Sequence, residues 1–269
     1  MKVLFFISVM MISLQGVAQT SPQQGQPTKT NQLDAKGQKT GPWTVTYDKT
    51  NKVRYKGQFK AGKPYGVFEH YYESGKLKAK ITYMTDGKTS RGKYYYENGN
   101  LLSEGKYINQ KKDSIWLFYD ERGKLSSSEK FVNDLNEGKK TVFYLNGSPS
   151  EVLNFKGGKR NGEWIRYFED GKTMIKGAYK DDMYAGEVLY YHTNGKMMLR
   201  EFYLNGKLEG VRIQYDDEGK EVARAHYKQG KKLEGKEEEA YIKEMEERKN
   251  NIQQQKQNGN KGTSGTKPK

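Results

Sequence analysis

Aromatic residues recur every twelve positions through the centre of the chain, and this is the strongest pattern in the sequence. Aromatics make up 13% of all residues, so about two would fall on sixteen such positions by chance. All sixteen positions are aromatic: Tyr47, Phe59, Tyr71, Tyr83, Tyr95, Tyr107, Tyr119, Phe131, Phe143, Phe155, Tyr167, Tyr179, Tyr191, Tyr203, Tyr215 and Tyr227. The spacing predicts an internal repeat.

Turn residues double the period to 24. Alternate aromatics are followed four residues later by Asn51 or by Gly75, Gly99, Gly123, Gly147, Gly171, Gly195 and Gly219. The others are followed three residues later by Gly62, Asp86, Gln110, Asp134, Gly158, Asp182, Gly206 and Gly230. Two turns per unit, with about eight residues between turns, are typical of β-hairpins. We therefore expect an all-β, elongated stack of about eight 24-residue β-hairpin repeats over 41–235.

Alternation within the segments predicts how the side chains are distributed. Ile165 and Tyr167 should share one face of a strand, and Gly177 and Tyr179 should share one face of the returning strand. We interpret the sixteen aromatics as one stacked ladder in which glycines make room for neighbouring rings. The opposite face is then mostly charged residues and Thr.

The first eighteen residues have the pattern of a secretory signal peptide. Lys2 precedes an apolar run from Val3 to Leu14, and small residues before Gln19 suit cleavage after Ala18. The alternative is an uncleaved anchor, although the run is shorter than the roughly 20 residues of a membrane span. The chain has no Cys, so the mature protein would have neither a lipidated Cys nor disulfides. We expect a secreted or periplasmic protein whose mature chain has no transmembrane segment.

Composition changes at both ends of the repeat region. Residues 19–40 contain one large aliphatic residue, Leu33, and should form a disordered leader. Strong helix formers with Tyr241, Met245 and Ile252 at near-helical spacing predict a charged helix over 236–257 that caps the stack. Residues 258–269 should be a disordered tail.

Two strings resemble the MORN-repeat variant of many bacterial proteins, in which G-x-W-x-x-Y-x-x-x-G-K is followed by x-G-x-Y. They are residues 161–172 (NGEWIRYFEDGK) and 104–107 (EGKY), and the resemblance covers roughly 41–235. Ser114 replaces the leading Gly of the fourth unit, Lys140 and Arg212 occupy the Trp position of the fifth and eighth, and the third is compressed around 90–92. The resemblance implies the hairpin-stack fold. Relatives are often labelled antitoxin components, and eukaryotic relatives are linked to membrane phospholipids.

Residues that could support catalysis are few. His70 and His192 would lie about 50 Å apart in a stack that advances about 10 Å per repeat, so they cannot share a metal ion. The chain has no Cys and no G-x-S-x-G sequence, and its acidic pairs lack the spacing of a calcium loop. We therefore expect a non-enzymatic protein with no catalytic, metal or cofactor site.

Positive charge is the one global feature that suggests a partner. The chain has a net charge of +15, and residues 41–235 contain 36 Lys and Arg against 26 Asp and Glu. Many lysines closely follow a turn glycine, which predicts a basic edge suited to an anionic lipid surface, an acidic polysaccharide or an acidic protein. The alternative is that these lysines only keep the turns soluble. Nucleic acid is not expected for a secreted protein.

The predicted binding surface combines these lysines with aromatics that follow the ladder by one residue and should point away from it. Its members are Lys76, Lys78, Lys80, Lys111, Lys112, Lys139, Lys140, Lys159, Arg160, Tyr72, Tyr96 and Tyr144. The leading function is a secreted or periplasmic binding scaffold for a protein or an envelope polymer. The alternatives are an anionic-membrane-associated scaffold and an antitoxin or immunity-like inhibitor of a partner protein.

Overall fold

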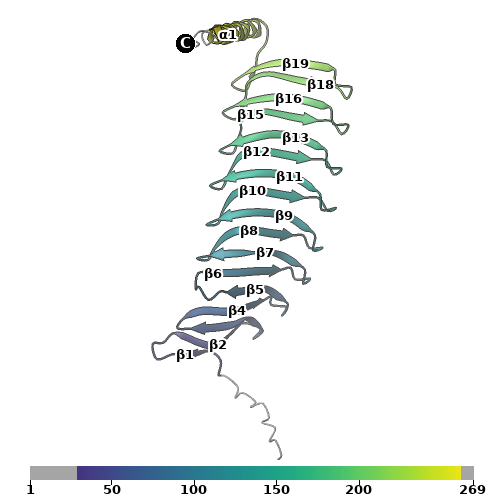
Figure 1. The fold of residues 1–269 in the computed structure, drawn as a ribbon. Coiled ribbons are helices and arrows are strands. Elements are labelled where there is room, and N and C mark those ends of the chain that lie inside the picture. Colours follow the sequence, from purple (N-terminus) through teal and green to yellow (C-terminus); the bar gives the residue numbers. More distant parts are fainter. Residues whose placement is uncertain (1–28, 262–269) are drawn as a thin grey trace, which may run out of the picture.

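The computed structural model describes residues 29–261, with side chains described up to residue 255. The chain forms one antiparallel sheet of 20 strands followed by one helix, and the hairpins stack along one axis (Figure 1). The predicted all-β hairpin stack is therefore confirmed. The predicted signal peptide, residues 19–28 and residues 262–269 lie outside the described residues.

Nearly every strand pairs with the next one in the chain. The elements are β1 (Gln32–Leu33), β2 (Lys39–Thr46), β3 (Val53–Lys60), β4 (Lys63–Tyr71), β5 (Leu77–Tyr83), β6 (Thr89–Tyr95), β7 (Leu101–Ile108), β8 (Lys111–Tyr119), β9 (Leu125–Val132), β10 (Leu135–Phe143), β11 (Pro149–Lys156), β12 (Lys159–Tyr167), β13 (Thr173–Lys180), β14 (Met183–Tyr184), β15 (Gly186–Tyr191), β16 (Met197–Leu204), β17 (Lys207–Leu208), β18 (Gly210–Tyr215), β19 (Glu221–Lys228), β20 (Lys231–Lys232) and α1 (Lys236–Lys261).

The two long edges of the sheet carry different turns. At the long-turn edge, between β4 and β5 for example, Tyr72 N–H donates to the carbonyl of Lys76, and Gly75 has φ of 90°. At the short-turn edge, pairs such as Asp181 and Asp182 both have positive φ. Two positive φ values are the signature of a type I′ turn, whose twist matches that of the flanking strands.

The sixteen aromatics do not form one ladder on one face. We call the face that carries Phe68 and Trp116 the inner face and the opposite one the outer face. Phe131 and Tyr179 are buried on the inner face, whereas the Tyr71 and Tyr119 hydroxyls bond Glu69 and Glu104, which lie outside in the alternation. Tyr71 follows Phe68 by three residues along β4 and so lies on the outer face, whereas Tyr83 pairs with Gly66 and lies on the inner face. A twelve-residue count along the chain does not reveal this difference, because the register between strands decides which face each set shares with its neighbours.

The core is a row of side chains along the inner face. Its most buried members include Phe68, Trp116, Trp164 and Val188, with Trp116 only 1% exposed. Glycines alternate with these large residues, as the sequence predicts: a Cβ on Gly105 would lie 2.2 Å from the Trp116 ring. Phe68 and Trp116 therefore pack directly on the backbone of the preceding strand, at Gly57 and Gly105.

Two ion pairs replace large apolar residues in this row. Lys140 and Arg212, which occupy the Trp position of their repeats, lie 3.0 Å from Glu129 and 2.9 Å from Glu201. Burial raises the pKa of Glu129, but hydrogen bonds from Lys140, Asn136 and Ser127 outweigh it and leave that pKa lowered. The fifth and eighth repeats thus keep the fold by pairing a charge with a charge where other repeats pair a ring with a glycine.

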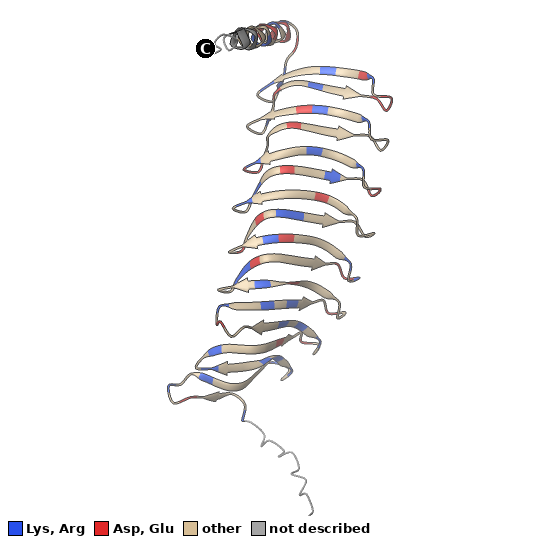
Figure 2. Cartoon of the chain, in the orientation of Figure 1, with Lys and Arg blue, Asp and Glu red and all other residues tan. Residues whose placement is uncertain are grey.

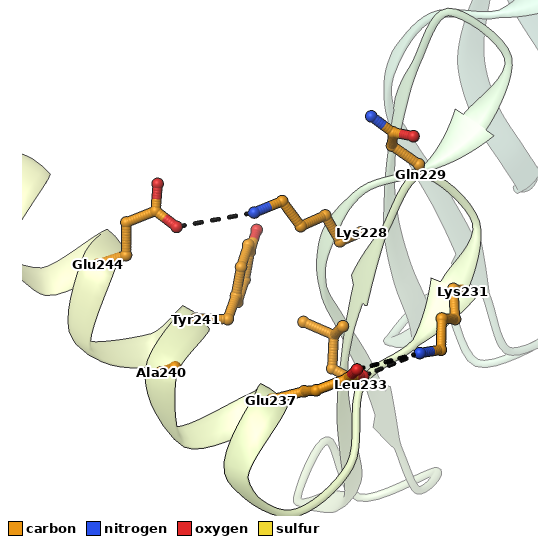
Figure 3. A pocket seen from close by; sticks show the side chains of 8 residues that line it. All are labelled: Lys228, Gln229, Lys231, Leu233, Glu237, Ala240, Tyr241 and Glu244. Carbon is orange, nitrogen blue, oxygen red and sulfur yellow. Dashed lines mark hydrogen bonds and ion pairs between the residues drawn. The ribbon is translucent and has the colours of Figure 1, made fainter.

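Both ends of the stack are covered. Gln32 and Leu33 pair with Thr40 and Lys39, so the last part of the expected disordered leader is an ordered edge strand. At the other end α1 begins at Lys236, where the helix was expected, and extends to Lys261. Tyr241 of α1 is buried (Figure 3). Within residues 29–261 no helix has the length and apolarity required to cross a bilayer.

Candidate binding surface

The predicted aromatic half of the binding surface has a structural role instead. Tyr72, Tyr96 and Tyr144 are half-buried at the long-turn edge. Each hydroxyl donates a hydrogen bond of 2.6–2.8 Å to a backbone carbonyl of the next repeat, at Tyr95, Tyr119 and Tyr167. These tyrosines do not point freely into solvent, because they join successive repeats. The expectation failed because the partner carbonyl lies a whole repeat away in the sequence.

The predicted basic residues do not form one edge either. Lys112 and Lys140 lie on the inner face, where Lys112 Nζ is 4.7 Å from the centre of the Trp116 ring. Arg160 stacks 4.2 Å above Tyr179 and pairs with Asp182. Cation–π contacts and ion pairs of this kind stabilise the stack. Lys111 and Lys159 are exposed beside short turns, Lys139 is exposed in the middle of β10, and Lys76, Lys78 and Lys80 are exposed near the long-turn edge or on β5.

Some lysines that follow a turn glycine stabilise neighbouring turns. Lys172 Nζ donates to the Thr193 carbonyl at 2.9 Å, and Lys196 Nζ donates to the Glu218 carbonyl at 3.0 Å. Their position in the repeat matches that of Lys76. For Lys172 and Lys196 the structure therefore favours a role in the turn over a role in binding.

Positive charge is concentrated in the first third of the stack. Between residues 53 and 108 eleven Lys and Arg stand against five Asp and Glu, a net charge of +6. Residues 109–235 hold 23 against 20, a net charge of +3 over more than twice the length. Figure 2 shows the same trend, with mainly blue strands near β5 and β6 and mixed colours towards the helix.

Four cations on the outer face of β5, β6 and β7 form what we call the cationic row: Lys80, Arg91, Lys93 and Lys106. Lys80 lies directly opposite Lys93, and Arg91 lies directly opposite Lys106. Like charges in such cross-strand positions destabilise a sheet. Three outer-face cations of later repeats differ: Lys176, Arg200 and Arg224 each pair with a carboxylate.

Carboxylates near the cationic row are already engaged. Glu69 pairs with Lys56 and Glu104 pairs with Lys93, both at 3.0 Å. Asp113, opposite Lys106 in the register, accepts a hydrogen bond from Ser114 at 2.9 Å. Within the described part of the chain, Lys80, Arg91 and Lys106 form no ion pair within 4.0 Å.

A shallow hollow of about 640 Å³ adjoins the row. Its floor is formed partly by Gly92 and Gly105, which have no side chains, and a bulge between Glu104 and Lys106 shapes one wall. Ile115, which is 60% exposed, and Leu117 add apolar surface. The hollow therefore combines cationic and apolar groups, as binding sites for organic anions do.

Half-buried tyrosines flank the row on the outer face, one per repeat, at Tyr71, Tyr95 and Tyr119. Tyr71 donates to Glu69 at 2.8 Å, and Lys56 Nζ lies 5.4 Å from the centre of its ring. The hydrogen bond from Tyr71 and then Lys56 lower the pKa of Glu69, and the hydrogen bond to Glu104 raises the pKa of Lys93.

The surface combines cations, apolar side chains and tyrosines, as binding sites do. Among residues 29–255, no three His, Cys, Asp or Glu side chains are grouped so as to hold a metal ion. Sequence reasoning identified Lys80 but missed Arg91, Lys93 and Lys106. Their signal was weak because they lie inside strands, away from the turn glycines, and become neighbours only through the sheet register.

Comparison with known proteins locates the repeats. The family described as MORN repeat variant matches residues 64–84, 89–109, 160–181 and 185–205. No curated protein matches the chain. A solved structure entitled "Crystal Structure of TcdB2-TccC3-TEV" is 14% identical to this chain, with a TM-score of 0.20. The match covers 66% of this chain and 12% of the chain in that structure. The first two matched segments include the whole cationic row, and in all four segments the chain is similar to the MORN repeat variant.

Proposed function

We propose that this protein is a non-enzymatic binding scaffold that acts outside the cytoplasm and presents its outer face at β5–β8 to a protein or an envelope polymer. Repeats of the MORN type commonly serve in binding or as scaffolds. Repeat stacks also offer long continuous surfaces, because each unit adds equivalent positions along one axis.

The observation that carries the proposal is the cationic row. Lys80 and Lys93, and Arg91 and Lys106, are neighbours with like charge on an exposed face. Lys93 is compensated by Glu104, but Arg91 and Lys106 have no ion-pair partner among the described residues, and that pair costs a few tenths of a kcal/mol in the free protein. An anionic partner would remove that cost, which supports a role for these residues in binding rather than in stability.

The proposed location rests on the first eighteen residues, whose charge and apolar pattern is that of a secretory signal peptide. N-terminal sequencing of the protein from a fractionated culture tests it. A mature N-terminus at Gln19 in the periplasmic or extracellular fraction is expected. An intact Met1 in the cytoplasmic fraction would refute it.

Affinity capture from an envelope fraction tests the binding role. The chain from Gln19 is immobilised beside a variant in which Lys80, Arg91 and Lys106 are replaced by Gln. We expect the wild type to retain a component at low salt that the variant does not retain. The chemical class of the retained component also distinguishes the candidate functions. An envelope polymer supports the scaffold, an anionic lipid supports the membrane-associated scaffold, and a protein supports either the scaffold or an antitoxin or immunity-like inhibitor. Equal retention by the two proteins would show that the row is not the binding surface.

A further inference from the structure

We infer that the outer face of β4–β8 binds a linear acidic polysaccharide lying along the stack axis. The inference rests on the proposed function and names its partner class. It follows from three features: the direction of the cationic row, the spacing of the tyrosines beside it, and the charge of the turns that border it.

The cationic row runs across the strands and therefore along the stack. Lys80 faces Lys93 across β5 and β6, and Arg91 faces Lys106 across β6 and β7. Neighbouring strands lie about 4.8 Å apart, so the row presents a positive charge at each strand it crosses. A linear polyanion laid in this direction would meet successive cations with successive charged groups.

The tyrosines supply a second periodic contact. Tyr71, Tyr95 and Tyr119 end β4, β6 and β8 on the same face, which places them about 10 Å apart. An extended β-linked polysaccharide turns equivalent sugar faces the same way at every second residue, a step close to this spacing. The apolar face of a sugar ring stacks on an aromatic ring, and half-buried tyrosines hold their rings in fixed orientations.

The border of the row favours a narrow polymer over a flat membrane. The long turn 72–76 has one Glu and one Lys, the turn 84–88 one Asp and one Lys, and the turn 96–100 one Glu and no cation. The net positive charge thus lies in the strands, between turns whose net charge is zero or negative. A bilayer would also lie against Glu73, Glu97 and Asp86, whereas a chain one sugar wide would not.

A peptide that adds a strand to the sheet is also disfavoured. Strand addition needs a free sheet edge. Strands β5–β7 lie inside the sheet, away from its two ends near β1 and α1 (Figure 1). The backbone groups of β5–β7 are already paired with neighbouring strands.

Binding to three probes tests the inference. The charged probe is β-linked polymannuronate, with a carboxylate on each sugar; the neutral probe is hydroxyethylcellulose, and the lipid probe is a phosphatidylglycerol vesicle. We expect the chain from Gln19 to bind polymannuronate most tightly, and the binding to weaken between low and physiological salt because exposed charges are screened over about 8–10 Å.

Two charge variants separate local from overall electrostatics. The first replaces Lys80, Arg91 and Lys106 by Gln, and should bind polymannuronate about tenfold more weakly if each lost contact has the strength of an ordinary exposed ion pair. The matched control replaces Lys176, Arg200 and Arg224 by Gln. It changes the net charge equally on the same face, in repeats where each cation already has a carboxylate partner. We expect this control to bind within about twofold of the wild type.

A further pair of variants tests the stacking contact. Tyr95→Leu should weaken polymannuronate binding about threefold, whereas Tyr191→Leu, at the same position of the seventh repeat, should not. Circular dichroism and urea midpoints establish that all variants fold. Tighter binding to vesicles than to polymannuronate, or equal losses in the two charge variants, would overturn the polysaccharide while leaving the binding scaffold intact. If neither the acidic polymer nor any component of an envelope fraction is retained, both proposals fail.

Discussion

Replacing Gly105 by Ala should destabilise the stack far more than the same change at Gly177. An Ala Cβ at 105 would lie 2.2, 2.3 and 2.5 Å from three atoms of the Trp116 indole. Carbon atoms pack best at about 3.5–4.0 Å, so the ring would have to move by more than about 1 Å. An Ala Cβ at 177 would lie 3.1 Å from a methyl group of Val188, which needs a much smaller adjustment.

The indole has little freedom to move. Trp116 is 1% exposed, its Nε1 donates to the Lys106 carbonyl at 3.0 Å, and Tyr107 packs edge-on at 4.9 Å between ring centres. Overpacking usually costs 1–3 kcal/mol, so we expect about 3 kcal/mol for Gly105→Ala and about 1 kcal/mol for Gly177→Ala. With a urea dependence of about 2 kcal/mol per molar, the two midpoints should differ by about 1 M.

Urea unfolding followed by circular dichroism measures both losses. The double variant Gly105→Ala with Trp116→Val replaces the indole by the smaller side chain that Gly177 faces at Val188. Its loss should be smaller than the sum of the two single losses by at least about 1 kcal/mol. Equal midpoints for the two glycine variants, or strictly additive losses in the double variant, would show that Trp116 does not pack on the backbone of β7.

Three further results are expected. Tyr179→Ala should cost about 3 kcal/mol in unfolding free energy and Tyr167→Ala clearly less, because only Tyr179 is buried in the core; urea midpoints that coincide would contradict this. Tyr72→Phe should cost about 1 kcal/mol through the lost bond to the Tyr95 carbonyl, and Tyr65→Phe, at an exposed position, should cost almost nothing. Burial, and then the charges of Lys78 and Arg54, lower the pKa of His70. The unfolded chain therefore binds more protons, and the thermal midpoint should fall as pH drops through about 6.5 in the wild type but less in His70→Asn.

Local signals in the sequence were sufficient for the repeat, the turns and the start of the helix. Gly75 and Asp182 mark turns because their backbone requires positive φ, and that requirement is visible in residue type alone. The expectation that glycines make room for neighbouring rings is confirmed at Gly105, which lies against the Trp116 indole. Lys236 begins α1, as the change to strong helix formers predicts.

Features that depend on the register between strands were not predictable from one sequence. Tyr71 and Tyr83 lie on opposite faces because Tyr83 pairs with Gly66, and the hydroxyl of Tyr72 finds its acceptor in the next repeat. Arg91 and Lys106 lie on different strands and meet only because β6 pairs with β7 in one register. The sequence therefore indicated that positive charge matters but assigned it to the turns instead of the strands.

Lysine acetylation read by mass spectrometry, with and without polymannuronate, tests the central claim most directly. The claim is that the outer face of the early repeats is the binding surface. Lys80, Lys93 and Lys106 should be protected by the polymer, because binding would bury their ammonium groups. Lys176 on the outer face of β13 and Lys140 on the inner face should react equally in both samples. Protection centred on Lys140 or Lys176, or spread evenly over all the lysines, would contradict the account.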